Sequence, residues 1–380
     1  MKKVYLDNAA TTMVADEVLK SMLPFFTDKY GNASCMHSWG EEARDALEES
    51  RSVIAKKLNA GADEIIFTAG GSESNNIAVK GIAYALKNKG NHIITSKFEH
   101  HAVLDVCKSL EKEGFSITYI SIDKDGFIKL DELKKAITDK TILVSIMHAN
   151  NEIGTIQDIS AIGKICKEHN VVFHTDAVQS FTKVPIDVKK SNLSLASFSA
   201  HKIHGPKGIG ALFVKKGIKL KKLIDGGAQE FNLRAGTENL PGAVGFAKAS
   251  ELISNKDIDK MALLRDYFIK EVTKQIPETS LNGSNKNRLC NNISFSFRNV
   301  EGESVLLALN DKGIAVTTSS ACTSAKLEPS HVLSAIGLKP EDSHGTVRFT
   351  ISKYTTNEDL DYTITALKEI ISKFRRMSPL

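Results

Sequence analysis

One segment of the 380-residue chain carries the groups that bind an anion such as phosphate. In "IIFTAGGSESNNIAV" (65–79), an apolar run passes through Gly70, Gly71 and Ser72 into a stretch of helical period. Backbone N–H groups at such a helix start, together with a hydroxyl, suit a phosphate. The spacing is neither that of a nucleotide P-loop nor that of a dinucleotide fingerprint. On its own, the segment is explained more simply as a glycine turn with Ser72 as a helix cap.

Two further segments place ionisable side chains after predicted strands. Asp176 ends "VVFHTD", where a carboxylate can hold a protonated ring nitrogen, and Gln179 can face the same crevice. Alone, Asp176 could equally cap a helix or form a salt bridge. Lys202 precedes a Gly/Pro turn, with Ser199 and His201 beside it, and is either a surface charge or a lysine that forms a Schiff base. Together and in this order, the three segments match what pyridoxal phosphate needs at its phosphate, ring nitrogen and aldehyde.

Other positions carry side chains that could act on a substrate. His100 and His101 follow "HIITS", where histidine could stack on a ring and move protons near neutral pH, or lie in a solvated loop. Arg348 in "TVRFTISK" offers bidentate hydrogen bonds to a substrate carboxylate, although on an alternating strand it could also face solvent. Cys322 lies among small polar residues in "TTSSACTSAKL", a composition that predicts an open, mobile loop.

Strand-like and helical segments alternate between about residues 40 and 215, and they must position these side chains. We expect strands at 64–68, 92–96, 116–122, 141–147, 171–176 and 210–214, and helices at 73–88, 101–114, 130–138 and 159–170. Such alternation predicts an α/β fold with a mostly parallel sheet and helices on both faces. Ligands of these folds bind outside the carboxyl ends of the strands, where the residues above are placed.

The second part of the chain has a different pattern. A long helical stretch from about 240 to 275 follows a Gly-rich excursion, and we place a domain boundary in or near it. Beyond it, strands are expected within 291–300, 313–318 and 346–353, and helices within 301–312 and 357–376. We therefore expect a large cofactor-binding domain of residues 13–255. Residues 1–12 and 256–380 would form a smaller α+β domain that carries the Cys322 loop.

Composition excludes several classes of protein. Hydrophobic residues make up 42% of the chain and charged residues 25%, which is typical of a soluble globular protein. The net charge is +5 without a long cationic block, so neither nucleic acid nor a membrane is an expected direct partner. The start of the chain lacks the apolar core of a signal peptide, which favours the cytoplasm. The five cysteines contain no C-x-x-C pair and fit reduced thiols, with no metal site required.

The chain resembles the group I cysteine desulfurases of the NifS/IscS type, which are fold-type I pyridoxal-phosphate enzymes. The resemblance covers essentially the whole chain and rests on a series of motifs: "YLDNAATT", "YGNAS", "FTAGGSESNN", "EHHAV", "HANNEIGT", "HTDAVQS", "SAHKIHGPKGIGAL", "RAGTEN" and "SSACTSAKLEPSHVL". It implies a large domain with a mostly parallel seven-stranded sheet. It also implies conversion of L-cysteine to L-alanine, with the sulfur passed on as a persulfide of Cys322.

The resemblance also implies roles for individual residues. Lys202 would bond the cofactor, His100 would stack on its ring, and Asp176 would pair with the ring nitrogen. Gln179 and Asn151 would lie near the ring hydroxyl. The phosphate would be bound by Gly71, Ser72, Ser199 and His201, and Thr237 would reach the phosphate of a second subunit. Arg348, with Asn151, would hold the substrate carboxylate. Cys322 would be the nucleophile, with His100 as a candidate to manage its proton.

The resemblance further implies a homodimer and a sulfur acceptor. The acceptor would be an iron–sulfur scaffold protein of the IscU/NifU kind or a tRNA-modifying protein, and Cys322 could transiently ligate a cluster shared with a scaffold. Selenocysteine lyase and aminotransferase remain alternatives on the same scaffold. Two positions depart from the family pattern: Ser319 stands where Gly is common, and Cys35 where Ser is common. We expect Cys35 to be a small buried residue, and Cys107, Cys166 and Cys290 to serve packing.

Overall fold

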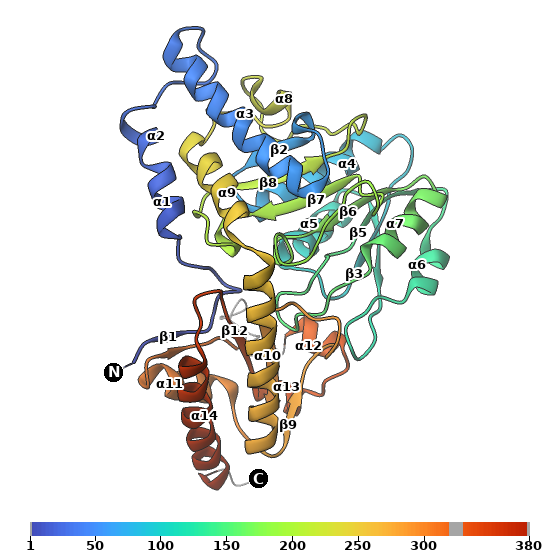
Figure 1. Ribbon diagram of the computed structural model, residues 1–380. Helices are drawn as coiled ribbons and strands as arrows, with labels where there is room; N and C mark the ends of the chain where they lie inside the picture. Colours follow the sequence, from blue (N-terminus) through green and yellow to red (C-terminus); the bar gives the residue numbers. More distant parts are fainter. Residues whose placement is uncertain (1, 319–329, 378–380) are drawn as a thin grey trace.

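A seven-stranded sheet forms the centre of the larger part of the molecule (Figure 1). The computed structural model describes residues 2–318 and 330–377. The strand order is β2-β8-β7-β6-β5-β3-β4, and β8 alone runs antiparallel to its neighbours. The strands are β2 (Ile65–Thr68), β3 (His92–Ser96), β4 (Ser116–Ile120), β5 (Thr141–Ser145), β6 (Val172–Asp176), β7 (Leu195–Ser199) and β8 (Gly210–Val214). The predicted α/β class with a mostly parallel sheet is confirmed.

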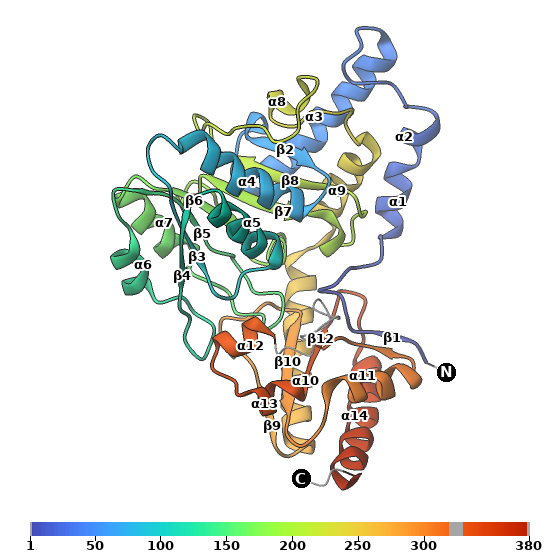
Figure 2. The same ribbon diagram turned by 180° about the vertical axis from the view of Figure 1, so that it is seen from behind.

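Helices cover both faces of this sheet. The four helices expected from periodicity are α4 (Gly71–Leu86), α5 (His101–Lys112), α6 (Leu130–Ala136) and α7 (Ile159–Glu168). Figures 1 and 2 show α4 and α5 on one face and α3 (Ser38–Leu58) with α9 (Leu240–Leu252) on the other. Successive strand residues divide between two cores because side chains alternate along a strand: Ile66 packs with the α4 and α5 side, and Phe67 with the α3 side.

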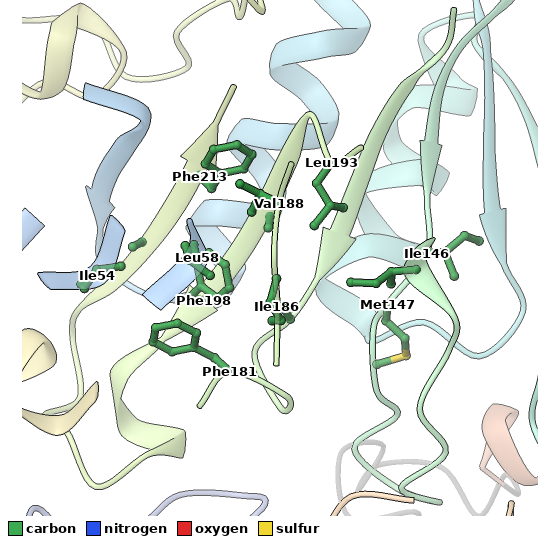
Figure 3. Close-up of a cluster of buried hydrophobic side chains, with 14 of the residues drawn as sticks. Ile54, Leu58, Ile146, Met147, Phe181, Ile186, Val188, Leu193, Phe198 and Phe213 are labelled. Carbon is green, nitrogen blue, oxygen red and sulfur yellow. The ribbon is translucent and has the colours of Figure 1, made fainter. Parts of the chain in front are cut away.

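The core on the α3 side contains large rings close together (Figure 3). Phe181 and Phe198 lie with ring centroids 4.7 Å apart, and Phe246 of α9 meets Phe181 edge-on at 5.8 Å. All three side chains are almost completely buried. This packing holds β7, and so the residues that follow it, against the α9 layer.

A third hydrophobic core lies in the smaller unit, the lower part of the molecule in Figure 2. Its antiparallel sheet has the order β12-β10-β9, and β1 pairs with β11 in parallel. Phe268 of α10 packs on Phe295 and Phe349 from the sheet. The elements are β1 (Val4–Tyr5), β9 (Thr279–Leu281), β10 (Asn292–Phe297), β11 (Ile314–Ala315), β12 (Thr346–Thr350), α10 (Asn255–Gln275), α11 (Gly302–Asp311), α13 (Pro340–His344) and α14 (Asn357–Met377).

The helical stretch expected from 240 to 275 is two helices, α9 and α10, separated by Ile253 and Ser254. Ser254 ends the continuity because its side chain and that of Asp257 form a capping box that starts α10. The shorter helices α1 (Asp16–Met22), α2 (Pro24–Thr27), α8 (Gln229–Asn232) and α12 (His331–Ala335), like α3, had no sequence prediction. Val332 and Leu333 of α12 pack into the core of the larger part.

Within residues 2–318 and 330–377, none of the helices has the length and apolar character needed to cross a membrane.

Candidate active site

The predicted site residues of the larger part follow strands that run in the same direction. β2, β3, β6 and β7 are mutually parallel, so their carboxyl ends meet at one edge of the sheet. Gly71 follows β2, His100 follows β3, Asp176 ends β6, and Lys202 ends the 3-10 turn after β7. The sheet topology therefore brings together four segments that are far apart in the sequence.

Lys202 is half-buried, and its amine is held by the N-terminal segment. Its Nζ donates to the carbonyl oxygens of Ala9 at 2.6 Å and Ala10 at 2.7 Å. Burial, followed by the positive charges of Arg348 and Lys183, lowers the pKa of Lys202 to about 8, and two carboxylates partly oppose this shift. With this pKa, about a tenth of the amine is uncharged at pH 7, and a nucleophilic lysine reacts in this uncharged form.

Asp176 is a buried carboxylate that is held by neutral donors. Its Oδ2 accepts from Asn75 Nδ2 at 2.7 Å, and its Oδ1 accepts from the Val178 amide at 3.0 Å. No lysine or arginine in the described part of the chain forms an ion pair with it. The carboxylate nevertheless raises the pKa of Lys202 and of His100, so it faces the same space as both. A buried carboxylate in this position suits a cationic ring nitrogen.

His100 caps the start of α5 and is oriented by that helix. Its Nδ1 accepts from the Ala102 amide at 3.1 Å, so the neutral ring carries its proton on Nε2. The residue is exposed, but surrounding protein atoms partly desolvate its ring, and this desolvation lowers the pKa of His100. The charge of Asp176 opposes this shift, and the charge of Lys202 adds to it. His100 is therefore mainly neutral at physiological pH.

The start of α4 is where the sequence predicts an anion cradle. A Cβ at Gly71 would lie 2.7 Å from Val178 Cγ2 and 3.7 Å from Ser199 Cβ, so only glycine fits without displacing Val178. Ser199 is buried beside it, and Ser72 is exposed in the first turn. His201 is half-buried, and burial lowers its pKa to about 4, with help from Lys202 and Lys207. The backbone N–H groups at the start of α4, the hydroxyls of Ser72 and Ser199 and the neutral imidazole of His201 fit a phosphate.

Arg348 is supplied by β12 of the smaller unit and is buried, which excludes the solvent-facing alternative. One of its terminal nitrogens lies 2.9 Å from Asp7 Oδ1, and the other donates to the carbonyl of Asn151 at 3.0 Å. Among the described residues its Nε has no partner. Because Arg348 lowers the pKa of Lys202, the guanidinium lies close to the lysine. It can contribute a cationic donor to an anion bound there.

The remaining predictions have different outcomes. Gln179 is buried and donates to the Ala9 carbonyl at 3.0 Å, which places it beside Lys202. Thr237 is exposed between α8 and α9, and its predicted contact is with a second copy of the chain. Cys322 and Ser319 lie outside the described residues. Cys35 is half-buried, so the expectation of a small buried residue was wrong, whereas Cys107, Cys166 and Cys290 are buried as predicted.

The amine, the carboxylate and the glycine cradle fit pyridoxal phosphate, since each one matches a different group of that cofactor. Sequence reasoning missed several residues of this site. Asp7 and Ala9 lie in the quoted motif "YLDNAATT", which was the available signal, but nothing in the motif shows that they contact Arg348 and Lys202. Asn75 lies in the quoted motif "FTAGGSESNN", which does not show its contact with Asp176, and Lys183 gave no signal because a lysine in a loop is ordinary.

Comparisons with known proteins show the family of this chain. Residues 4–363 match the family "Aminotransferase class-V". Cysteine desulfurase IscS of Dictyoglomus turgidum is 56% identical over all of this chain and 97% of its own length. The protein of that name from Methanosarcina thermophila is 51% identical over all of this chain and 94% of its own.

Solved structures are also similar to this chain. A structure described as a NifS-like protein has a TM-score of 0.92 and 38% identity, covering 98% of this chain and 100% of its own. A structure of SspA in complex with cysteine has a TM-score of 0.84 and 39% identity, covering 93% and 100%. Similarity to solved structures therefore extends over nearly the whole chain.

Proposed function

The chain belongs to the aminotransferase class-V family. From this membership and its identity to cysteine desulfurases, we infer that this pyridoxal-phosphate-dependent cysteine desulfurase releases L-alanine from L-cysteine. In this proposal the sulfur moves onto Cys322. The observation that carries the proposal is the Lys202 amine, half-buried after β7 with its pKa lowered to about 8 beside a buried carboxylate and a buried guanidinium. The same groups would serve an unrelated ligand poorly, because each one matches a different part of the cofactor or substrate.

The cofactor's residues have separate tasks. When bound, pyridoxal phosphate supplies an electron-withdrawing ring that stabilises negative charge on the substrate carbon it holds. Lys202 would hold the cofactor through its aldehyde, and its Nζ would serve as the base for the Cα proton of the substrate. Asp176 keeps the ring nitrogen protonated. Gly71, Ser72, Ser199 and His201 would bind the phosphate, and Gln179 and Asn151 would hold the ring hydroxyl.

Substrate positioning falls to Arg348, whose guanidinium binds the cysteine carboxylate with help from Asn151. Asp7 already holds one arm of this guanidinium, so the side chain is oriented before the substrate arrives. His100 would lie against the cofactor ring, and its Nε2, which carries the proton of the neutral ring, would exchange a proton with the thiol groups.

Sulfur transfer needs a second thiol. The Cys322 thiolate attacks the substrate sulfur, so an S–S bond forms as the C–S bond breaks. The electron pair of the broken bond stays with the carbon fragment, which takes up protons and leaves as alanine. Sulfur is thus held as a persulfide, ready for a second thiol or an acceptor protein.

The proposal extends to partners. A homodimer is supported by large exposed hydrophobic side chains near the start of the chain: Leu19, Leu23, Phe26, Tyr30, Met36 and Trp39. Thr237, on an exposed loop, would complete the phosphate site of the second copy. We also propose a cytoplasmic enzyme that gives its sulfur to an iron–sulfur scaffold of the IscU/NifU kind or to a tRNA-modifying protein.

The test is to incubate the holoenzyme with L-cysteine and a reductant and to measure alanine and sulfide. Equal amounts of both are expected, and Cys322→Ser should bind cofactor and substrate but lose persulfide formation. Mass spectrometry should find the extra sulfur on Cys322, and extra sulfur on Cys35 instead would overturn the assignment. Keto acid formation undiminished in Cys322→Ser would favour an aminotransferase.

A further inference from the structure

Lys183 is a buried cation next to the site and has no role in the proposed reaction. Only 7% of the residue is exposed. No carboxylate in the described ranges forms an ion pair with it, although buried lysines are rarely left without one. Its Nζ instead donates to two backbone carbonyls, those of Gln179 at 2.9 Å and Lys202 at 3.3 Å. Burying an ammonium in this way is costly, which makes its position informative.

These two hydrogen bonds connect Lys183 to two residues that share a third partner, Ala9. Gln179 Nε2 donates to the Ala9 carbonyl at 3.0 Å, and Lys202 Nζ donates to the same oxygen at 2.6 Å. Lys183 therefore joins the main chains of the two residues whose side chains converge on Ala9. A small cavity of about 10 Å³ beside it is also lined by Lys202 and Asn291.

The charge of Lys183 also acts on Lys202. Arg348 and Lys183 both lower the pKa of the Lys202 amine, whereas Asp7 and Asp176 raise it. The pKa of Lys183 is itself lowered to about 8 by burial. The other titratable groups that it influences are His204, whose pKa burial lowers to about 4, and Cys290, whose pKa burial raises.

We propose that Lys183 is a positioning residue of this active site: it clamps the main chain of Lys202 to that of Gln179, and its charge disfavours protonation of the Lys202 nitrogen. The juxtaposition is a feature of the structure, but its consequence for catalysis rests on the proposed role of Lys202 as the cofactor lysine. A purely structural lysine would give the clamp without the electrostatic effect.

The experiment is a pH titration of the cofactor absorbance in the holoenzyme, which follows proton loss from the nitrogen that joins Lys202 to the cofactor. Lys183→Met removes the charge and the donors, Lys183→Gln removes the charge but keeps a donor, and Lys183→Arg keeps both. The two uncharged variants should bind the proton about three- to ten-fold more tightly, so their midpoints move to higher pH. The arginine variant should keep the original midpoint.

Lys260→Met is the matched control, because Lys260 also donates to a backbone carbonyl, that of Lys353 at 2.9 Å, but is exposed. If Lys183→Met fails to fold, Lys183→Gln carries the test. Midpoints of both uncharged variants that match the control would overturn the inference. Reduction with borohydride and peptide mapping separate the two proposals: no label on Lys202 refutes both, whereas a labelled Lys202 with unchanged midpoints refutes only the role of Lys183.

Discussion

Glu99, the residue before His100, should make the stability of this protein depend on pH. Its side chain is completely buried. Oε1 accepts from Ser96 Oγ at 2.5 Å and from the Met147 amide at 2.9 Å, and Oε2 has no partner within the described residues. Burial raises the pKa of Glu99 from 4.5 to about 8, and nearby Asp176 adds to the effect. Glu99 is therefore protonated in the folded chain at neutral pH.

The sign follows from proton linkage. Between pH 4.5 and 8 the folded chain holds a proton that the unfolded chain has lost, so the free energy of unfolding falls as the pH rises. The difference between the two pKa values corresponds to about 5 kcal/mol, at about 1.4 kcal/mol per pKa unit. The side chain in Glu99→Gln is neutral at every pH and keeps an acceptor oxygen. The substitution therefore removes the fall in the free energy of unfolding that Glu99 causes. The variant should gain stability relative to the unaltered protein by up to about 5 kcal/mol across that range.

Urea unfolding of both holoproteins, followed by circular dichroism at a series of pH values, gives this difference directly, because the other titrating groups cancel. Glu132→Gln is a suitable control, since its half-buried carboxylate also accepts from a backbone amide, that of Ser121 at 3.0 Å. A stability difference between Glu99→Gln and the unaltered protein that stays constant from acid to alkaline pH would refute a buried, protonated Glu99.

Three further predictions concern other buried groups. Arg348→Lys loses one of two charge-assisted arms and should raise KM for L-cysteine about ten- to one hundred-fold in an alanine-formation assay; an unchanged KM would remove Arg348 from the substrate site. Glu230→Ala removes the buried partner of Arg51, paired at 2.7 Å, and leaves only the more exposed Glu48 at 3.1 Å, so it should cost about 3 kcal/mol in urea unfolding, with a much smaller loss arguing for rearrangement. Cys107 and Cys166, whose pKa values burial raises to about 12, should resist iodoacetamide until the protein is denatured; mass spectrometry of native protein showing either one alkylated would contradict this.

Local pattern alone determined much of the larger part of this protein. The strands at 92–96 and 210–214 match β3 and β8 residue for residue, because buried runs bounded by turn residues leave little ambiguity. Knowing that the strands were parallel was enough to expect Gly71, His100, Asp176 and Lys202 at one edge. Periodicity did not detect the break at Ile253 and Ser254, because both flanking segments are helical and only the capping box separates them.

Tertiary structure decided what those residues can do. Lys202 acquires its lowered pKa from burial and from Arg348 and Lys183, of which Arg348 lies on a strand of the smaller unit. The pair of Arg348 and Asp7 joins residues 341 positions apart in the chain. Sequence pattern specifies which side chains an element presents, since it reflects local backbone geometry. The neighbours that set a charge state are fixed only when separate elements pack and exclude water.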